Sequence, residues 1–289
     1  MDLWFRILGL GYDLSYANRS IGPSHISFGA RGFKSTSLVR IYPDGGGENS
    51  DFEGDSSGGS IDFGRPLDRK NRIDLRLSST DNRFTHESGP VLTPTDLIDN
   101  AIQDGRANSA RLSFTHDTRF DPFSPREGRY ERFATEWGGG MLGGEFSYGK
   151  QTIDFRTYHP MGEKWVFASR YTGGIIGGSA PATTLFWVGG ANSLRGYEVG
   201  EQKGKFMALS NVEFRYSPPD SPYGLVAFVD MGTTSNEWKS LSFKNPLIGA
   251  GIGFRMQVGF FGVAPIRFDL GYNFEDGNTQ FHFSVGHLF

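Results

Sequence analysis

The chain has 289 residues, of which 37% are hydrophobic and 15% aromatic, with 41 glycines, no cysteine and a net charge of −3. The lack of cysteine excludes a disulfide framework and a thiolate metal site, and the near-neutral charge gives no reason to expect a nucleic-acid partner. A mean hydropathy of −0.39 argues against helical membrane spans, which need roughly 18 consecutive apolar residues. A membrane β-strand escapes this test, because only every second residue faces lipid.

The N-terminal part of the chain carries the weaker strand signals. Residues 1–16 lack the basic start, the uninterrupted apolar core and the small-residue cleavage site of a signal peptide. Strand patterns follow near 3–16, 24–33, 34–43, 57–66 and 70–80. The Gly-, Ser- and Asp-rich stretch 44–60 is predicted to be a surface loop.

Stronger strand patterns continue near 109–120, 128–139, 145–159, 164–176, 205–217 and 223–233. Short turns rich in Pro and Gly alternate with long polar connections at 82–108 and 179–203. Alternating connection lengths are typical of outer-membrane barrels, whose periplasmic turns are short and whose outer loops are long. Counting these patterns and those that follow gives about fourteen strands, with an error of about two.

The clearest alternation lies near the C-terminus. In the strand from Ile248, apolar residues such as Ile252 and Phe254 share one face, while glycines and Arg255 share the other. The last strand places Phe281, Phe283, Val285 and Phe289 on one side, so Phe289 is expected to be an aromatic anchor at the membrane interface. Charged residues on the second face require a wet lumen, and strands in lipid require closure. The sequence therefore predicts an all-β fold, a transmembrane antiparallel β-barrel of about 14–16 strands.

Five stretches of the sequence stand out in order: Thr115–Gly128, Phe186–Tyr197 with its Leu-Arg-Gly-Tyr sequence, Leu209–Arg215, Val229–Thr233 and Pro265–Tyr272 before the final strand. In the same order, they resemble the barrel domain of the BamA/TamA superfamily of outer-membrane assembly factors, also described as the bacterial surface antigen barrel domain. They are spread over residues 109–289, whereas residues 1–108 match only in general strand character.

The Leu194-Arg195-Gly196-Tyr197 motif is the leading candidate site. Arg195 is costly inside a barrel unless carboxylates pair with its guanidinium, and by alternation Glu213 and Asp230 both face inward. The resemblance implies the same pairing. We therefore expect this long extracellular loop to fold into the lumen, where Gly196 permits close backbone approach and Tyr197 packs. The alternative is an arginine on a solvated outer loop.

The resemblance also implies a function. The expected protein is an integral protein of the outer membrane of a double-membraned bacterium, an assembly and insertion factor whose clients enter through a lateral seam between the first and last strands. Its expected partners are the lipid bilayer, unfolded outer-membrane protein clients, and periplasmic lipoproteins or other assembly partners. Gly286 and Phe289 resemble the C-terminal strand signal that assembly machinery reads as an exposed edge.

Other functions stay open at this point. One is the translocation pore of a two-partner secretion system, which shares the Arg-Gly-Tyr loop, and another is a porin or accessory barrel. Catalysis is not expected, because Ser113 and His116 fall on opposite faces of their strand. No cofactor and no metal is expected. Residues 1–289 are interpreted as a single barrel domain, truncated at its N-terminus, without the signal peptide and the periplasmic POTRA repeats typical of the family.

Overall fold

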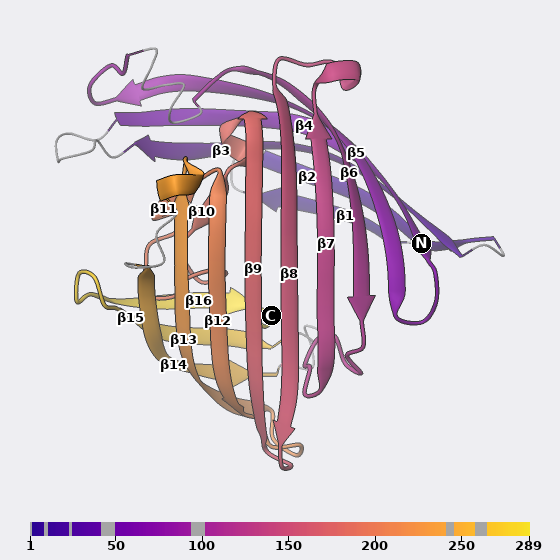
Figure 1. Ribbon diagram of the computed structural model, residues 1–289, viewed down its shortest axis with the longest axis vertical. Helices are drawn as coiled ribbons and strands as arrows, with labels where there is room; N and C mark the ends of the chain where they lie inside the picture. The colour runs from indigo at the N-terminus through magenta and orange to yellow at the C-terminus, as the bar shows by residue number, and fades with distance from the viewer. Residues whose placement is uncertain are drawn as a thin grey trace. The chain divides into compact units, whose positions relative to one another are not determined.

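The computed structural model describes residues 2–8, 11–22, 25–41, 50–93, 102–240, 246–257 and 265–289. Its strands form a 14-stranded sheet in the order β1-β2-β3-β4-β5-β6-β7-β8-β9-β12-β13-β14-β15-β16, with a separate two-stranded sheet of β10 and β11 (Figure 1). The bounds are β1 Asp2–Leu8, β2 Gly11–Ile21, β3 Ile26–Ile41, β4 Ser50–Pro66, β5 Asn71–Ser88, β6 Gly105–Asp117, β7 Gly128–Gly138, β8 Ser147–Met161, β9 Trp165–Ser179, β10 Phe186–Val188, β11 Gln202–Gly204, β12 Phe206–Tyr216, β13 Tyr223–Ser235, β14 Leu247–Met256, β15 Ile266–Asn273 and β16 Thr279–Val285.

The prediction of an all-β antiparallel fold is confirmed. The described helices are single three-residue turns, η1 (Gly140–Leu142), η2 (Ala182–Thr184) and η3 (Trp238–Ser240). Within the described ranges, no helix has the length and hydropathy to cross a bilayer. The chain divides into two compact units, of which the first comprises residues 1–114, 134–150 and 176–185, and the second comprises residues 115–133, 151–175 and 186–289.

The first unit contains the long strands β3, β4 and β5, and here three sequence predictions are wrong. The pattern near 3–16 forms two strands, β1 and β2, which pair with each other. The patterns near 24–33 and 34–43 form one continuous strand, β3. The stretch expected to be a surface loop contains most of β4, which begins at Ser50, while residues 42–49 lie outside the described residues. β4 pairs with β3 on one edge and with β5 on the other over its length. These backbone hydrogen bonds stabilise the strand although its side chains are small.

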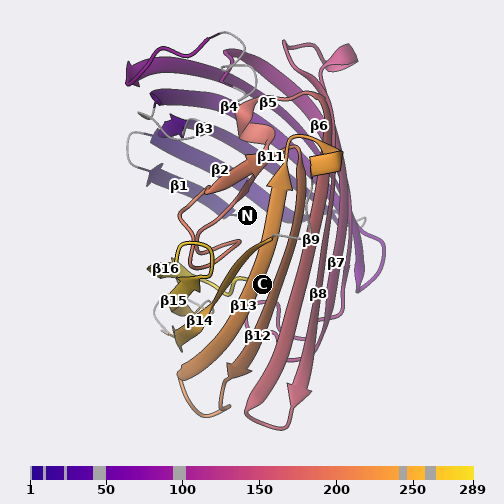
Figure 2. The same ribbon diagram turned by 60° about the vertical axis from the view of Figure 1, so that its left-hand side comes forward.

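In the second unit, successive side chains alternate between a buried and an exposed face. Along β13, Leu225 and Val229 are exposed, whereas Val226, Phe228 and Asp230 are buried. The registers of β12–β16 are continuous antiparallel ladders, so the buried faces of neighbouring strands line up. The connection that contains β10 and β11 lies beside β13 (Figure 2).

The expected outward position of Phe289 is wrong. Strand β16 ends at Val285, and Gly286 has a φ of 95°, which breaks the alternation of sides. Phe289 is 3% exposed and packs with Leu288, Tyr158, Val166 and Ala168 on the buried side of the strands. The last residues therefore contribute to the interior, while Phe281 and Phe283 remain on the exposed face as expected.

Candidate functional site

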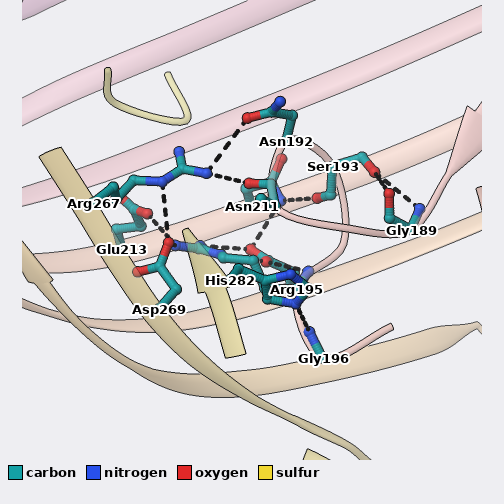
Figure 3. Close-up of polar contacts among 12 residues, drawn as sticks. Gly189, Asn192, Ser193, Arg195, Gly196, Asn211, Glu213, Arg267, Asp269 and His282 are labelled. Atoms are coloured by element: carbon teal, nitrogen blue, oxygen red, sulfur yellow. Dashed lines mark hydrogen bonds and ion pairs between the residues drawn. The ribbon is translucent and has the colours of Figure 1, made fainter. Parts of the chain in front are cut away.

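The candidate site is the connection from β10 to β11, residues 186–204, which contains the Leu-Arg-Gly-Tyr motif. β10 and β11 pair as a short antiparallel ladder that closes the base of this connection. Gly189 and Gly190 have positive φ values of 123° and 88° and begin a tight turn, in which the Gly190 N–H donates to the carbonyl oxygens of Leu194 and Tyr197 at 3.0 and 3.1 Å. The Ser193 hydroxyl donates to the Gly189 carbonyl oxygen and accepts from its N–H, both at 2.9 Å (Figure 3). This turn presents Arg195 to the strands.

Arg195 is fully buried and bound by two carboxylates. Its Nε and Nη2 donate to Asp230 Oδ2 and Oδ1 at 2.7 and 2.9 Å, and its Nη1 donates to Glu213 Oε1 at 2.6 Å. The Arg195 main-chain N–H also donates to Asp230 at 3.0 Å, and the guanidinium carbon lies 3.5 Å from the centre of the Phe228 ring. Burial disfavours the charge, but the attraction of Asp230 and Glu213 exceeds that effect, so the pKa of Arg195 is raised above its ordinary value. The guanidinium is therefore a permanent cation.

A second layer of charges surrounds this pair on β12, β14 and β15. Arg215 Nε donates to Glu213 Oε2 at 2.7 Å. Arg255 Nη1 donates to Asp269 Oδ1 at 2.6 Å, and Arg267 Nε lies 3.1 Å from Asp269 Oδ2. Every one of these side chains is buried. Alternating positive and negative groups thus extend from the loop across the buried face of the strands.

The loop backbone lies directly against β14 and β15. A Cβ added to Gly249 would lie 1.9 Å from the Arg195 carbonyl oxygen, and one added to Gly271 would lie 2.5 Å from the Gly196 nitrogen. Gly196 has a φ of 96°, and its N–H donates to His282 Nε2 on β16 at 3.0 Å. Because His282 Nε2 accepts this hydrogen bond, that ring nitrogen carries no proton. Glycines on both partners are therefore what allows the close approach.

Apolar and amide contacts hold the rest of the motif. Leu194 and Tyr197 are buried in a cluster with Val188, Leu209 and Leu247. The Tyr197 hydroxyl donates to the carbonyl oxygen of Ile248 and accepts from its N–H, both at 3.1 Å. Asn211 Nδ2 donates to the Ser193 carbonyl oxygen at 2.6 Å and to Asp230 Oδ1 at 2.8 Å. Hydrogen bonds, ion pairs and packing therefore all hold one loop conformation.

This arrangement suits a structural attachment better than a reaction centre. The carboxylates of Glu213 and Asp230 are engaged by arginines, so neither is available as a general base. Among the described residues, no group of three or more His, Asp and Glu is placed to hold a metal ion. The buried ion pairs of this site attach the connection between β10 and β11 to strands β12 and β13.

The structure brings most of the predicted site residues together. Leu194, Arg195, Gly196 and Tyr197 lie against the strands with Glu213 and Asp230, whereas Gly286 and Phe289 lie beyond β16, with Phe289 beside Arg215. Sequence reasoning missed three partners of the loop: Asn211, His282, and Asp269, whose Oδ2 lies 3.7 Å from Arg195 Nη1. It also missed the glycines of β14 and β15 against which the loop backbone packs. Alternation identifies the face on which these residues lie, but the strand register is needed to show which of them lie at the depth of Arg195.

Comparisons with known proteins identify the family of this chain. Residues 8–289 match the Omp85 superfamily domain. The outer membrane protein assembly factor BamA of Nitratidesulfovibrio vulgaris is 25% identical over 95% of this chain, and the match covers 36% of that protein. The chain thus spans about a third of the length of this curated relative.

Solved structures show the same fold. BamA from Haemophilus ducreyi lacking POTRA domains 1–3 has a TM-score of 0.75 at 18% identity, covering 96% of this chain and 61% of that one. CdiB from Acinetobacter baumannii has a TM-score of 0.66 at 15% identity, covering 96% of this chain and 49% of that one. The chain belongs to the Omp85 superfamily and is an integral outer-membrane protein.

Proposed function

We propose that this chain is the barrel of an outer-membrane protein assembly factor, which inserts unfolded outer-membrane proteins through a lateral seam between its first and last strands. Membership of the Omp85 superfamily supports this proposal, as does the similarity of 95% of the chain to an assembly factor. Periplasmic lipoproteins or other assembly partners, and POTRA repeats preceding the barrel, belong to the same proposal.

The observation that carries the proposal is the form of the last strand. β16 has seven residues, pairs with β15 and stands at the end of the strand order. Beyond Val285 the chain leaves the ladder, and Leu288 and Phe289 are buried. A short terminal strand offers few backbone groups to a permanent neighbour, whereas an incoming client strand can pair with its edge by β-augmentation. The Arg195 loop holds β14, β15 and β16 in place while a client strand pairs with the edge of β16.

Disulfide crosslinking tests where a client pairs. The chain has no cysteine, so each introduced cysteine is unique. Phe283→Cys on β16 is compared with the control Val229→Cys on β13, both on the exposed face, while the protein in liposomes folds a client that carries one cysteine in its final strand. Crosslinks at residue 283 and none at residue 229 are expected.

The same experiment separates the two classes of transport. A third variant, Thr152→Cys, places the cysteine on the face of β8 opposite exposed Ile153. Crosslinks that form only at residue 152 would indicate a polypeptide passing through the lumen, as in a two-partner secretion pore, and would refute insertion at the β16 edge. Equal crosslinking at residues 229 and 283 would also refute it.

A further inference from the structure

A small cavity lies in the second unit, apart from the Arg195 loop. Its volume is about 30 Å³, roughly twice the space that one water molecule needs. Arg215 of β12, Arg255 of β14 and His287, beyond the end of β16, all line it. The remaining lining residues are uncharged and include Ser124, Val166, Ser217 and Gln257.

The arginines and the turn that line this cavity are held in place by hydrogen bonds to the rest of the protein. Arg215 Nε donates to Glu213 at 2.7 Å, and Arg215 Nη2 donates to the Phe289 main-chain oxygen at 2.9 Å. Arg255 Nη1 donates to Asp269 Oδ1 at 2.6 Å. Arg126, beside the lining turn, donates through Nη1 to the Ser217 carbonyl oxygen at 2.7 Å. The two guanidinium groups that line the cavity are therefore fixed without any help from its contents.

Several polar atoms of these residues have no hydrogen-bond partner within the described part of the chain. They are Arg215 Nη1, Arg255 Nε, Arg255 Nη2 and His287 Nδ1, all with negligible exposure to solvent. The Arg255 Nη2 atom lies 3.7 Å from Glu213 Oε1, which is an ion-pair distance but too long for a hydrogen bond. A buried donor left without an acceptor costs roughly 1–3 kcal/mol, and more when it is charged.

The side chains that line the cavity determine whether it favours a positively or a negatively charged ion. The guanidinium atoms are donors only, and no described residue that lines the cavity has a carboxylate. Burial and the nearby charge of Arg215 hold the pKa of His287 well below its ordinary value, so its ring is neutral and can donate through Nδ1–H. Guanidinium and imidazole donors that have no hydrogen-bond partner, in a lining without a carboxylate, suit an anion and repel a cation. The volume is too small for a lipid headgroup.

We propose that this cavity binds one inorganic anion of halide size, coordinated by Arg215, Arg255 and His287. Bound there, the anion joins β12, β14 and the segment after β16 through one centre. It shields the two arginines from each other and stabilises the point where the chain leaves its last strand. This is independent of the proposed function, because the site requires neither a client nor an open seam.

Anomalous diffraction and thermal unfolding test the proposal together. Crystals of the protein grown in sodium bromide are expected to show an anomalous peak among Arg215, Arg255 and His287. In micelles, the Tm is expected to rise to a plateau as chloride replaces gluconate at constant ionic strength, as for any ligand that binds only the folded state. Arg255→Met should abolish the chloride-dependent shift. Arg129→Met is the matched control, since Arg129 is exposed and paired with Glu131 at 3.2 Å, and it should keep the shift.

Each remaining outcome opposes the proposal. Equal Tm values in chloride and gluconate with no bromide peak would mean that water satisfies the donors. A bromide peak without a chloride-dependent Tm would indicate an adventitious ion only. A Tm shift that persists in Arg255→Met would place the effect elsewhere. Should Arg255→Met fail to fold, His287→Phe, which removes one donor and fills space, is expected to weaken the chloride dependence in its place.

Discussion

At the scale of single residues, Arg195 dominates the site because it is 0% exposed and still charged. Burying a guanidinium costs several kcal/mol, and only well-formed ion pairs with further hydrogen bonds offset that cost. Two nitrogens of its guanidinium donate to Asp230 and the third donates to Glu213, and the guanidinium plane lies over the Phe228 ring. This geometry is specific to arginine, whose planar group has donors in fixed directions.

Replacing Arg195 tests how much stability this geometry contributes. Arg195→Ala leaves two buried carboxylates short of a partner, so the free energy of unfolding in micelles should fall by about 3–5 kcal/mol. Arg195→Lys keeps the charge but loses bidentate contact, so it should recover only part of that loss. Urea titration followed by heat-dependent gel mobility measures both. An Arg195→Lys protein as stable as the wild type would show that charge alone suffices, and the exposed Arg129→Ala serves as control.

Lys203 supplies a prediction on pH. It lies in β11 beside Trp187, and burial lowers its pKa from the ordinary 10.5 to about 8. Between these values the unfolded chain holds more protons than the folded protein, so stability should rise as pH increases through that window. Lys203→Met should remove this part of the pH dependence. The measurement is the free energy of unfolding at several pH values from 7 to 10.5, and identical slopes for the two proteins would contradict the assignment.

Only part of this residue-level picture could be predicted. Alternation placed Glu213 and Asp230 on the inner face, and the structure has both within hydrogen-bond distance of Arg195. It could not identify Asp269 or His282 as partners, because they belong to strands whose register depends on long-range pairing. The prediction for Phe289 was wrong for a local reason, since the positive φ of Gly286, three residues earlier, ends the alternation of sides before Phe289 is reached.

At the scale of elements, the loop packs closely on the strands because glycines, which have no side chain, lie at the point of contact. Gly249 on β14 and Gly271 on β15 leave room for the backbone of Arg195 and Gly196. Glycine usually weakens a strand, so its place there is explained by close backbone approach. The strand patterns from residue 109 onward predicted these elements well, whereas the Gly- and Ser-rich β4 was missed because pairing on both edges outweighed its composition.

The substitution Gly271→Ala tests this close contact between the loop backbone and β15. The new Cβ would lie 2.5 Å from the Gly196 nitrogen, so either the loop or β15 must shift and lengthen the contacts of Arg195. Overpacking of this kind costs about 1–3 kcal/mol. Gly32→Ala on β3 is the control, because a Cβ there meets no atom within 4 Å. Differential scanning calorimetry should show a lower Tm for Gly271→Ala alone, and equal Tm values would mean that the loop is not seated on this strand.

At the scale of the whole molecule, the exposed face of the strands is the surface that meets lipid in an integral outer-membrane protein. Large apolar side chains on this face include Val229 near the middle of β13 and Tyr223 at its start. The strand count of about fourteen matches the 14-stranded sheet, although the N-terminal strands differ in their bounds. That residues 1–289 form a single barrel domain stays a prediction.

Arginine substitutions along β13 test this orientation. An arginine facing the centre of a bilayer costs about 2–4 kcal/mol, but about 0–1 kcal/mol near the interface. Val229→Arg should therefore destabilise the protein in liposomes far more than Tyr223→Arg does. Guanidinium unfolding followed by tryptophan fluorescence measures the difference. Equal costs at the two positions would contradict a membrane-spanning β13.

The contact between Gly196 and His282 joins residues 86 positions apart, and this separation has a consequence for the order of folding. The loop is synthesised before β12, yet its carboxylates, its glycine seat and its histidine acceptor all come from later strands. Closing such a distant contact is entropically expensive and therefore late. Arg195 meets Glu213 and Asp230 once β12 and β13 have paired, but until β15 and β16 follow, the loop lacks its glycine contact on β15 and its histidine acceptor. Completion of the C-terminal strands is thus the event that fixes the loop.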